Sequence, residues 1–445
     1  METGLQHALN IKSASIVTLG CRSNQYDSSA IEEMLKSAGI RMVKFPAPAD
    51  VCIINTCTVT KRTDAQSRQF IRQARLVNPD AIVMATGCYA QVFSDEISSM
   101  AGVDFVIGNA EKHRILEFLR LGRQAKTPKT HVGDFRLGAS FDLKARVFSG
   151  RTRANLKVQE GCNLNCSYCI IPKARGASKS LALSDVEKEL DSLSGLSYKE
   201  IVLTGIHLGA YGVDLSPRAC LASVLKIFDD KKYPCRLRLS SIDPNEVTED
   251  LIEIMKGSDG VCRHLHLPLQ SGDNGLLKKM RRPYAREDFA SLVLRLKKDM
   301  PQISIGTDVM AGFPGEGEKE FENTFSLLKD LPISYMHIFP YSRRSGTDAA
   351  AFGRQVHGGI LKDRVGRLRG LDEEKRKGFF KGFVGTVRPV VAEAMDKKTG
   401  LLNGRTDNYL PVEFHGPKGL QNTLVNIRLN GFNGRKMQGE IVVSI

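Results

Sequence analysis

Short apolar runs, each followed by a helical pattern, recur along most of this chain of 445 residues. In the first part the apolar runs are 15–19, 51–55, 81–86 and 105–107, and the helical stretches that follow them are 27–38, 65–77, 95–100 and 111–121. A strand that is apolar along its whole length is buried on both faces, which is typical of a parallel sheet. The alternation therefore predicts a parallel α/β domain over about residues 13–125.

A second series of apolar runs follows a polar linker at about 126–152. These runs are 155–159, 200–204, 236–240, 264–269, 303–309 and 335–339. Six strand–helix units fit a partial (β/α)6 barrel over about 153–378, and barrel active sites collect at the C-terminal strand ends. In the last segment, about 380–445, alternating runs at 386–392, 409–414, 423–428 and 439–443 are separated by Gly and Asn turns. This pattern predicts a small antiparallel β-barrel.

Three cysteines with C-x3-C-x2-C spacing, Cys162, Cys166 and Cys169, follow the first strand of the central series. Three thiolates on one loop can hold three corners of a [4Fe–4S] cluster and leave the fourth iron open to a small molecule. The alternative is a zinc site or structural thiols. Zinc sites usually take four ligands in paired units, and no fourth ligand stands nearby.

Three other cysteines, Cys21, Cys57 and Cys88, each stand just past the end of a separate strand in the first domain. Parallel strands bring their C-terminal ends to one edge of the sheet, where α/β proteins bind ligands. The three thiols are therefore expected to converge. The alternative is three unrelated cysteines buried in the core, where cysteine is common.

The net charge is +15, and Lys and Arg are spread along the chain, which favours an anionic partner with nucleic acid first. A basic but uninvolved surface is the alternative. Ten cysteines are too few for a disulfide scaffold. The start of the chain lacks a signal peptide pattern, and no run of eighteen apolar residues exists. We therefore expect a cytoplasmic protein with reduced thiols and no membrane span.

The segments 18–27, 55–60 and 86–91 resemble the N-terminal domain of the methylthiotransferases, and the C-x3-C-x2-C loop resembles that of the radical S-adenosylmethionine (SAM) superfamily. The resemblance implies two [4Fe–4S] clusters and SAM as cofactors. The loop cysteines would hold the cluster at which SAM is cleaved to a radical. Cys21, Cys57 and Cys88 would hold an auxiliary cluster that carries or donates sulfur.

The same resemblance implies a set of contacts to SAM at the barrel strand ends and beside the last loop cysteine. These are Tyr168, Thr204, Gly205, Ser240, Gln270 and Asp308. For any one of these polar residues, a turn or cap role is the alternative. Together, at consecutive strand ends, they predict a SAM pocket.

Contacts to RNA are predicted at three places. The segments 383–386, 404–409 and 439–442 resemble a TRAM domain, an RNA-binding barrel. Charge and stacking predict contacts from Arg405 and Tyr409. Arg68, Arg72 and Arg75 share one helix face, and Arg343 follows the sixth barrel strand. The alternatives are a solvated cationic helix face and a barrel that only stabilises the fold.

The segments 24–27 and 202–212 resemble the methylthiotransferases that act on N6-threonylcarbamoyladenosine in tRNA. The implied reaction adds a methylthio group at C2 of that base, next to the anticodon. We expect the protein to act as a monomer. We expect its electrons to come from a flavodoxin- or ferredoxin-like donor. The family alternatives are the enzymes for isopentenyladenosine in tRNA and for a ribosomal-protein aspartate. An alternative of another class is a non-catalytic RNA-binding Fe–S protein.

Overall fold

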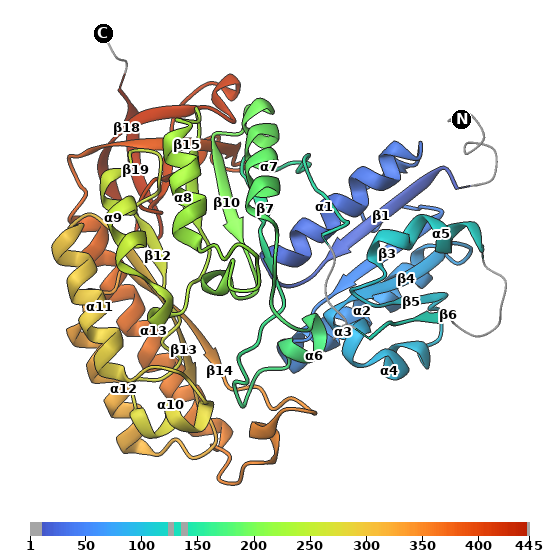
Figure 1. The fold of residues 1–445 in the computed structure, drawn as a ribbon, viewed down its shortest axis with the longest axis horizontal. Coiled ribbons are helices and arrows are strands. Elements are labelled where there is room, and N and C mark those ends of the chain that lie inside the picture. The colour runs from blue at the N-terminus through green and yellow to red at the C-terminus, as the bar shows by residue number, and fades with distance from the viewer. Residues whose placement is uncertain (1–10, 123–128, 135–140, 443–445) are drawn as a thin grey trace. The chain divides into compact units, whose positions relative to one another are not determined.

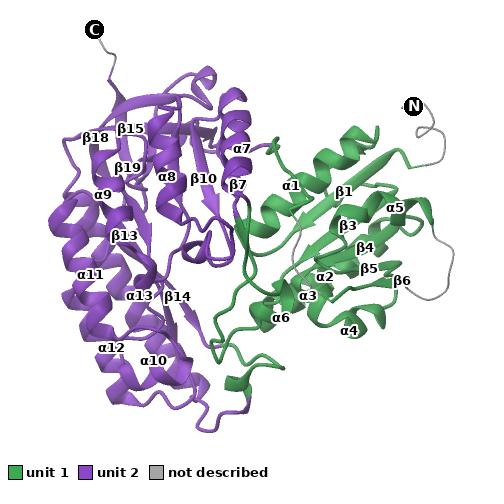
Figure 2. Ribbon diagram, viewed as in Figure 1, with its two compact units in different colours: residues 1–149, 159–181, 342–350 green, residues 150–158, 182–341, 351–445 purple. Residues whose placement is uncertain are grey.

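The structure is a computed structural model that describes residues 11–122, 129–134 and 141–442. The chain divides into two units, coloured separately in Figure 2. Unit 1 contains 1–149, 159–181 and 342–350, and unit 2 contains 150–158, 182–341 and 351–445. The cysteine loop thus belongs with the N-terminal sheet, and the C-terminal barrel belongs with the central strands. The three-domain boundaries inferred from the sequence stay a prediction, and 126–128 and 135–140 of the predicted linker lie outside the described residues.

Unit 1 is built on a six-stranded sheet in the order β2-β1-β3-β4-β5-β6, with every pairing parallel (Figure 1). The strands are β1 (Ser13–Thr18), β2 (Arg41–Met42), β3 (Val51–Thr56), β4 (Ile82–Gly87), β5 (Phe105–Ile107) and β6 (Lys129–His131). The predicted parallel α/β fold is confirmed. The two edge strands, β2 and β6, were not predicted because they are short and polar.

Helices cover both faces of this sheet. They are α1 (Arg22–Ser37), α2 (Lys61–Val77), α3 (Cys88–Val92), α4 (Ser94–Ser98), the 3₁₀ turn η1 (Lys112–Arg114) and α5 (Ile115–Arg120). Successive residues of a strand point to opposite faces. Ile53 therefore belongs to the core formed with Ile31 and Phe118. Its neighbour Ile54 belongs to the core formed with Ile71.

A segment from the middle of the sequence completes unit 1. It contains the antiparallel pair β8 (Gln159–Glu160) and β9 (Lys179–Ser180), the cysteine loop between β8 and the next helix, and that helix, α6 (Ile171–Arg175). The Asn109 side-chain amide donates to the carbonyl of Ala174 at 2.7 Å, which ties α6 to the loop after β5. The cysteine loop therefore has a defined place within unit 1.

Six parallel strands form the centre of unit 2. They are β7 (Ala154–Lys157), β10 (Glu200–Thr204), β11 (Arg236–Leu239), β12 (His264–His266), β13 (Ser304–Ala311) and β14 (Tyr335–Pro340). The ladders β11-β10-β7 and β12-β13-β14 are joined by parallel bridges that pair Leu237 with Val261 and Ser241 with His266. This order confirms the predicted partial (β/α)6 barrel.

Helices lie along the outer side of these strands (Figure 1). They are α7 (Leu183–Gly195), α8 (Leu221–Asp230), α9 (Glu249–Gly257), α10 (Asn274–Met280), α11 (Arg286–Asp299), α12 (Glu318–Asp330) and α13 (Gly358–Lys381), with short 3₁₀ turns η3 (Leu208–Ala210), η4 (Pro244–Glu246) and η5 (Asp348–Ala351). Most carry one apolar stripe; in α8, Val224, Leu225 and Phe228 are buried. These helices cover the outer side of the strands and not their C-terminal ends, which is where barrel active sites form.

The C-terminal segment forms a closed barrel of five strands in the order β15-β16-β17-β19-β18. The strands are β15 (Val387–Met395), β16 (Leu402–Thr406), β17 (Pro411–Phe414), β18 (Leu424–Phe432) and β19 (Met437–Ile441), with the 3₁₀ turn η6 (Lys418–Leu420). The predicted small barrel is confirmed; its pairings are antiparallel as predicted except that of β17 with β19, which is parallel. Strand β16 was missed because Asn403 and Gly404 resemble a turn. A Cβ on Gly404 would lie 2.3 Å from Val390, so only glycine fits where β15 passes.

A buried ion-pair cluster joins this barrel to the central strands. Glu200 is fully buried and pairs with Arg236 and Arg238, with N–O distances of 2.7 Å. Burial alone would raise the pKa of Glu200, but the two guanidinium groups hold it well below its usual range. Both arginines also donate to backbone carbonyls of the small barrel, Arg236 to Thr406 and Arg238 to Asp407. Within unit 2, the small barrel is therefore anchored by charge as well as apolar packing.

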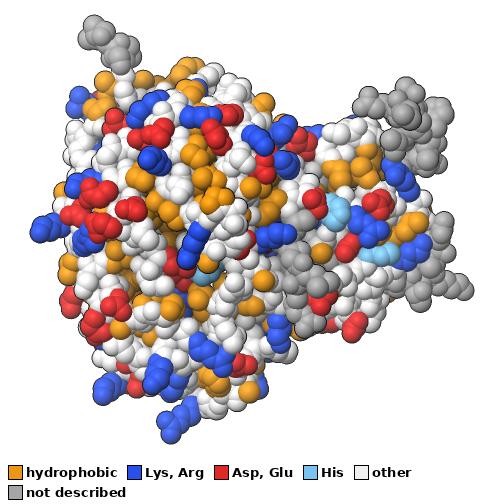
Figure 3. Space-filling model, viewed as in Figure 1, with side chains coloured by type: hydrophobic (Ala, Val, Ile, Leu, Met, Phe, Trp, Pro, Cys, Tyr) orange, Lys and Arg blue, Asp and Glu red, His pale blue; other side chains and the backbone are white. Residues whose placement is uncertain are grey.

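Among the described residues, every helix is too short or too polar to span a lipid bilayer. On the face drawn in Figure 3, Lys and Arg side chains are interspersed with Asp and Glu in both units. On this face, the Lys and Arg side chains therefore do not form one continuous basic patch.

Candidate metal and cofactor site

Three cysteines converge at the C-terminal edge of the unit 1 sheet. Strands β1, β3 and β4 are neighbours, and their registers align the ends that precede Cys21, Cys57 and Cys88. A Cβ placed on Gly20 would lie 2.7 Å from the Cys57 sulfur, so the first cysteine loop passes directly over the second cysteine. The sequence predicted this convergence, and the structure brings the three residues together.

The chemistry of the site follows from its burial. Cys57 and Cys88 are both 3% exposed, whereas Cys21 is exposed. Burial raises the pKa of the Cys57 thiol to about 12, and the neighbouring thiols of Cys88 and Cys21 add to the shift. Since the thiolate is the form that ligates metal, a cationic cluster bound here would lower the pKa of these thiols and favour that form. The site is therefore suited to a metal and unsuited to a free nucleophile.

Polar side chains tie the cysteine loops to one another. The Asn24 amide donates to the carbonyl of Leu19 at 2.8 Å and to that of Thr56 at 2.9 Å. The Thr56 hydroxyl donates to the carbonyl of Thr86 at 2.6 Å. Gly87, with φ of +95°, has the Thr56 carbonyl 2.4 Å from where its Cβ would be. These contacts fix the relative positions of the three strand ends.

Several buried polar atoms around the triad have no hydrogen-bond partner within the described part of the chain. They are Asn55 Oδ1, Thr86 Oγ1 and Asn109 Oδ1. Asn55 and Thr86 stand two residues before Cys57 and Cys88, and the Asn109 amide nitrogen lies 3.8 Å from the Cys88 sulfur. Leaving a buried polar atom unpaired costs about 1–3 kcal/mol, so such a cluster is expected where a polar or ionic guest binds. This observation fits a cluster held by three cysteines.

The second set, Cys162, Cys166 and Cys169, lies in unit 1 on the loop between β8 and α6. Backbone hydrogen bonds join Cys162 to the Gly176 carbonyl and Cys169 to the Cys166 carbonyl, each at 3.0 Å. Gly161 has φ of +70°, and a Cβ there would lie 2.0 Å from the Ala177 carbonyl. The loop thus bends back on 176–178, which presents three thiols from one short segment, as the spacing predicted.

Most of the predicted SAM contacts lie in unit 2, at or just past the ends of its strands. Thr204 ends β10, with Gly205 next, Ser240 follows β11 and Gln270 lies four residues past β12, whereas Tyr168 lies on the cysteine loop in unit 1. Asp308 was predicted at a strand end but lies inside β13, three residues before its last residue, because that strand continues to Ala311. Ser240 Oγ and Gln270 Oε1 are buried and have no partner among the residues described. Gln270 also has φ of +66°, and its carbonyl accepts from Met310 N at 2.9 Å. Unpaired buried polar atoms at these strand ends fit a bound ligand.

Asp308 has protein partners. Its Oδ1 lies 3.0 Å from His266 Nε2 and 3.4 Å from His337 Nδ1. Burial opposes ionisation of Asp308, but the hydrogen bonds and charges of the two histidines hold its pKa below the usual range. Tyr335 extends this series of contacts, since its hydroxyl lies 3.1 Å from His266 Nδ1. The role of Asp308 as a SAM contact stays a prediction.

The arginines predicted to contact RNA from α2 differ in their surroundings. Arg75 is engaged by the protein: it pairs with Asp104 at 2.5 Å and donates to the carbonyls of Pro79, Ala81 and Gly102. Arg68 donates to the Tyr89 hydroxyl at 2.6 Å and pairs with Glu96 at 2.8 Å. Arg72 is exposed. The shared face therefore consists of one exposed cation beside two that support the fold.

The other predicted RNA contacts are Arg343, Arg405 and Tyr409. Arg343 is exposed and donates through Nε to the Ala350 carbonyl at 2.7 Å. The Arg405 guanidinium lies 4.3 Å from the centre of the Tyr409 ring, and that ring lies 4.3 Å from the His264 ring. Tyr409 thus packs where the small barrel meets the central strands. Its contact with RNA, like those of the other basic residues, stays a prediction.

A buried charge cluster beside the cysteine triad was not predicted from the sequence. It contains Asp27, Lys112, Glu160 and Arg175, all of them buried. Glu160 and Arg175 flank the cysteine loop, and Asp27 belongs to the segment 18–27. The available signal was charged residues next to both cysteine motifs, but their pairing joins positions far apart in the sequence.

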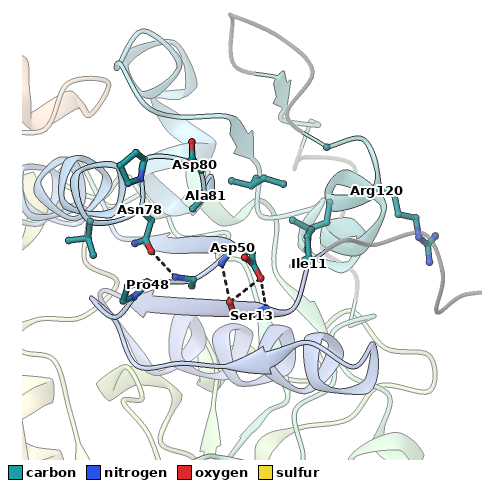
Figure 4. A pocket seen from close by; sticks show the side chains of 14 residues that line it. Ile11, Ser13, Pro48, Asp50, Asn78, Asp80, Ala81 and Arg120 are labelled. Atoms are coloured by element: carbon teal, nitrogen blue, oxygen red, sulfur yellow. Dashed lines mark hydrogen bonds between the residues drawn. The ribbon is translucent and has the colours of Figure 1, made fainter.

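A pocket lies at the opposite, N-terminal edge of the same sheet (Figure 4). There the Asp50 carboxylate accepts from Lys12 N and Ser13 N at 2.8 Å, and Asn78 Oδ1 accepts from Ala49 N at 2.7 Å. These groups are used to join the starts of β1, β3 and β4. Because ligands of α/β sheets bind at the carboxyl ends of strands, this pocket does not compete with the cysteine edge.

Comparison with known proteins gives matches over the same two regions. An uncharacterized protein family, UPF0004, matches residues 13–108, and the radical SAM superfamily matches 156–328. Threonylcarbamoyladenosine tRNA methylthiotransferase MtaB of Bacillus subtilis is 40% identical over 417 residues, 93% of this chain and 92% of that protein. tRNA-2-methylthio-N(6)-dimethylallyladenosine synthase of Clostridium tetani is 32% identical, over 96% of each chain.

Among solved structures, the radical S-adenosylmethionine methyltransferase TsrM from Kitasatospora setae matches with a TM-score of 0.54. The two chains are 15% identical, and 76% of each is covered. At this identity the likeness shows a common fold and carries no information on substrate.

Proposed function

The chain belongs to the radical SAM methylthiotransferase family, and we propose that it adds a methylthio group to C2 of N6-threonylcarbamoyladenosine next to the anticodon of tRNA. The family assignment rests on 40% identity, over nearly the full length of both chains, to a relative named threonylcarbamoyladenosine tRNA methylthiotransferase. As a member of the radical SAM superfamily, the chain uses SAM and a [4Fe–4S] cluster. The substrate base, the second cluster and the partners belong to the proposal.

The observation that carries the proposal is the convergence of Cys21, Cys57 and Cys88 at one sheet edge, in addition to the separate C-x3-C-x2-C loop. A radical SAM enzyme needs only the loop to cleave SAM. A second set of three thiols, with unpaired polar atoms around it, supports a second [4Fe–4S] cluster with an open iron. When bound, the loop cluster supplies the electron for reductive cleavage of SAM, and the auxiliary cluster supplies a sulfur site.

The side chains of this chain have assigned tasks in the proposal. At the strand ends, Ser240 Oγ would donate a hydrogen bond to SAM or accept one from it, and Gln270 Oε1 would accept one, since both atoms are buried and unpartnered among the described residues. Burial excludes water from these groups, which strengthens each hydrogen bond to the ligand. The radical chemistry suits the substrate because an aromatic C–H is not opened by ordinary acid–base catalysis.

The remaining features of the proposal follow from the reaction. We propose that the protein acts on tRNA in the cytoplasm, and reductive cleavage of SAM requires a low-potential donor such as a flavodoxin- or ferredoxin-like protein. We propose that the chain acts as a monomer. The small C-terminal barrel is proposed to bind RNA in the manner of a TRAM domain.

The decisive test is the nucleoside content of tRNA. The chain is expressed in a strain that makes N6-threonylcarbamoyladenosine but lacks its methylthio derivative, and digested tRNA is examined by mass spectrometry. We expect the 2-methylthio product to appear. Cys220→Ala is the matched control, because Cys220 is an exposed cysteine outside both sets, and it should retain the product. If the strain that expresses the intact protein contains the methylthio product only at background level, the substrate assignment is refuted.

The dimethylallyladenosine reaction is the second candidate, because a relative named for it is 32% identical over 96% of this chain. It is tested in the same strain by following N6-isopentenyladenosine and its methylthio derivative. A product on that base alone would replace the first candidate.

A methylthio group on a ribosomal-protein aspartate is followed by peptide mass spectrometry. RNA binding without any 5′-deoxyadenosine release would favour the non-catalytic alternative.

A further inference from the structure

Arg175 is the last residue of α6, six residues after the final loop cysteine, and its side chain is 1% exposed. Its Nε lies 3.3 Å from the Cys88 sulfur, at the triad on the sheet edge. One residue of the segment that carries the radical loop thus contacts a cysteine of the other set. All of these residues belong to unit 1.

The rest of the guanidinium is held by carboxylates and an amide. One terminal nitrogen lies 3.1 Å from Asp27 Oδ2 and 3.0 Å from Glu160 Oε2. The other donates to Asn24 Oδ1, from the side chain that ties the first two cysteine loops together. With its terminal nitrogens engaged in this way, the guanidinium plane is fixed and Nε is the nitrogen directed at the sulfur.

Charge balance explains how a guanidinium can be buried here. Asp27 also pairs with Lys112 at 2.7 Å, and Lys112 is 1% exposed. The cluster therefore holds two cations and two carboxylates, and a neutral group of this kind can be buried where a single charge cannot. A thiolate at Cys88 would add one negative charge, directly in front of the Nε–H donor.

We propose that Arg175 is a positioning residue for the auxiliary cluster, which donates its Nε–H to the Cys88 sulfur and thereby raises the reduction potential of that cluster. The inference rests on the proposed second cluster. A hydrogen bond to a cluster sulfur stabilises the reduced, more negative state relative to the oxidised one. The same side chain would couple the position of α6 to the triad, because it spans Asn24, Cys88 and Glu160.

The test isolates the auxiliary cluster by working in a parent that carries Cys162→Ala, Cys166→Ala and Cys169→Ala. After anaerobic reconstitution this parent should hold about four irons per chain. Arg175→Gln and Arg175→Lys are made in the parent, and the midpoint potential is measured by titration followed with electron paramagnetic resonance. Thermal unfolding of each apo chain is measured alongside.

Arg344→Gln is the matched control. Arg344 is also a buried arginine of unit 1 with a carboxylate partner, Asp64, but it donates to Thr58 and forms no hydrogen bond with a cysteine among the described residues. We expect Arg175→Gln to lower the midpoint potential by an amount that changes the reduction equilibrium at least tenfold, which is about 59 mV for one electron. Arg175→Lys should lower it less, because the charge is kept and the planar donor is lost. The control should leave it unchanged.

The outcomes separate the two proposals. A parent without iron would refute the second cluster itself. If the parent holds iron but Arg175→Lys and Arg175→Gln leave its midpoint potential unchanged, the role of Arg175 is overturned and the second cluster stands. If Arg175→Gln does not fold, Arg175→Lys decides: a lowered midpoint supports the inference, and an unchanged one overturns it. A shift of equal size in Arg344→Gln would also overturn it, because it would show a general effect of lost buried charge.

Discussion

The two cysteine sets of unit 1 are constructed in contrasting ways. One is assembled from three strand ends spread over residues 21–88, and it exists only when β1, β3 and β4 are paired. The other lies within 162–169 and needs only that its loop bends back on 176–178. The first site therefore depends on correct formation of the whole sheet, whereas the second depends only on a local turn.

The largest test of this contrast removes each set in turn. Substitution of Cys21, Cys57 and Cys88 by Ala should abolish methylthio transfer and halve the iron from about eight to about four per chain. 5′-Deoxyadenosine should still be released from SAM, because the loop set is intact. Substitution of the loop set should abolish both transfer and release. Loss of SAM cleavage in the first variant, with its loop iron retained, would show that the sets do not divide the chemistry.

Two glycines sharpen the comparison at the level of backbone. A Cβ on Gly87 would overlap the Thr56 carbonyl across two strands, and a left-handed conformation is strained for alanine. We expect Gly87→Ala to lose the auxiliary iron and destabilise the apo chain by about 3 kcal/mol. Gly161→Ala should lose the loop iron but cost only about 2 kcal/mol, because a short loop can shift locally to relieve the overlap and mainly the strain of the left-handed conformation remains.

Iron analysis and thermal unfolding measure both effects. Gly39→Ala serves as the control: its φ is +82°, but no atom lies within 4 Å of the added Cβ. It should cost roughly 1–2 kcal/mol from the left-handed conformation alone and retain all iron. Equal losses of stability in Gly87→Ala and Gly161→Ala would remove the distinction between a sheet-built and a loop-built site.

The thiols themselves should differ in reactivity in the apo chain. Because burial and neighbouring thiols raise the pKa of Cys57 to about 12, its thiolate is scarce at pH 8. Alkylation of Cys57 by iodoacetamide should therefore be at least ~100-fold slower in the folded apo chain than in urea, and should accelerate about tenfold per pH unit above 8. Cys162 and Cys169 are half-buried and should be labelled earlier. Peptide mass spectrometry at timed points resolves each site, and rapid labelling of Cys57 at pH 8 would contradict its buried state.

The sequence could predict both cysteine sites because each depends on a regular feature. The triad follows from strand ends in a parallel sheet, and the loop follows from spacing alone. It could not predict Arg175, because its partners Asp27 and Cys88 lie 148 and 87 positions away and no local pattern joins them. Nor could it separate Arg75, which supports the fold through four hydrogen-bonded groups, from Arg72, which is exposed. Periodicity assigns a residue to a face, but the partners on that face come from other elements.

The smallest expected difference concerns the asparagine that secures each site. Asn24 is fully buried and bridges Leu19 and Thr56, so Asn24→Ala leaves two carbonyls and Arg175 with lost partners and should cost about 2–3 kcal/mol. Asn163 is exposed and its Oδ1 accepts from Ser178 N at 2.9 Å, so water can replace it and Asn163→Ala should cost about 0.5–1 kcal/mol. Denaturant unfolding of the two apo variants gives both values. The triad depends on buried hydrogen bonds and the loop on a solvent-exposed one. A larger loss of unfolding free energy in Asn163→Ala than in Asn24→Ala would contradict this difference.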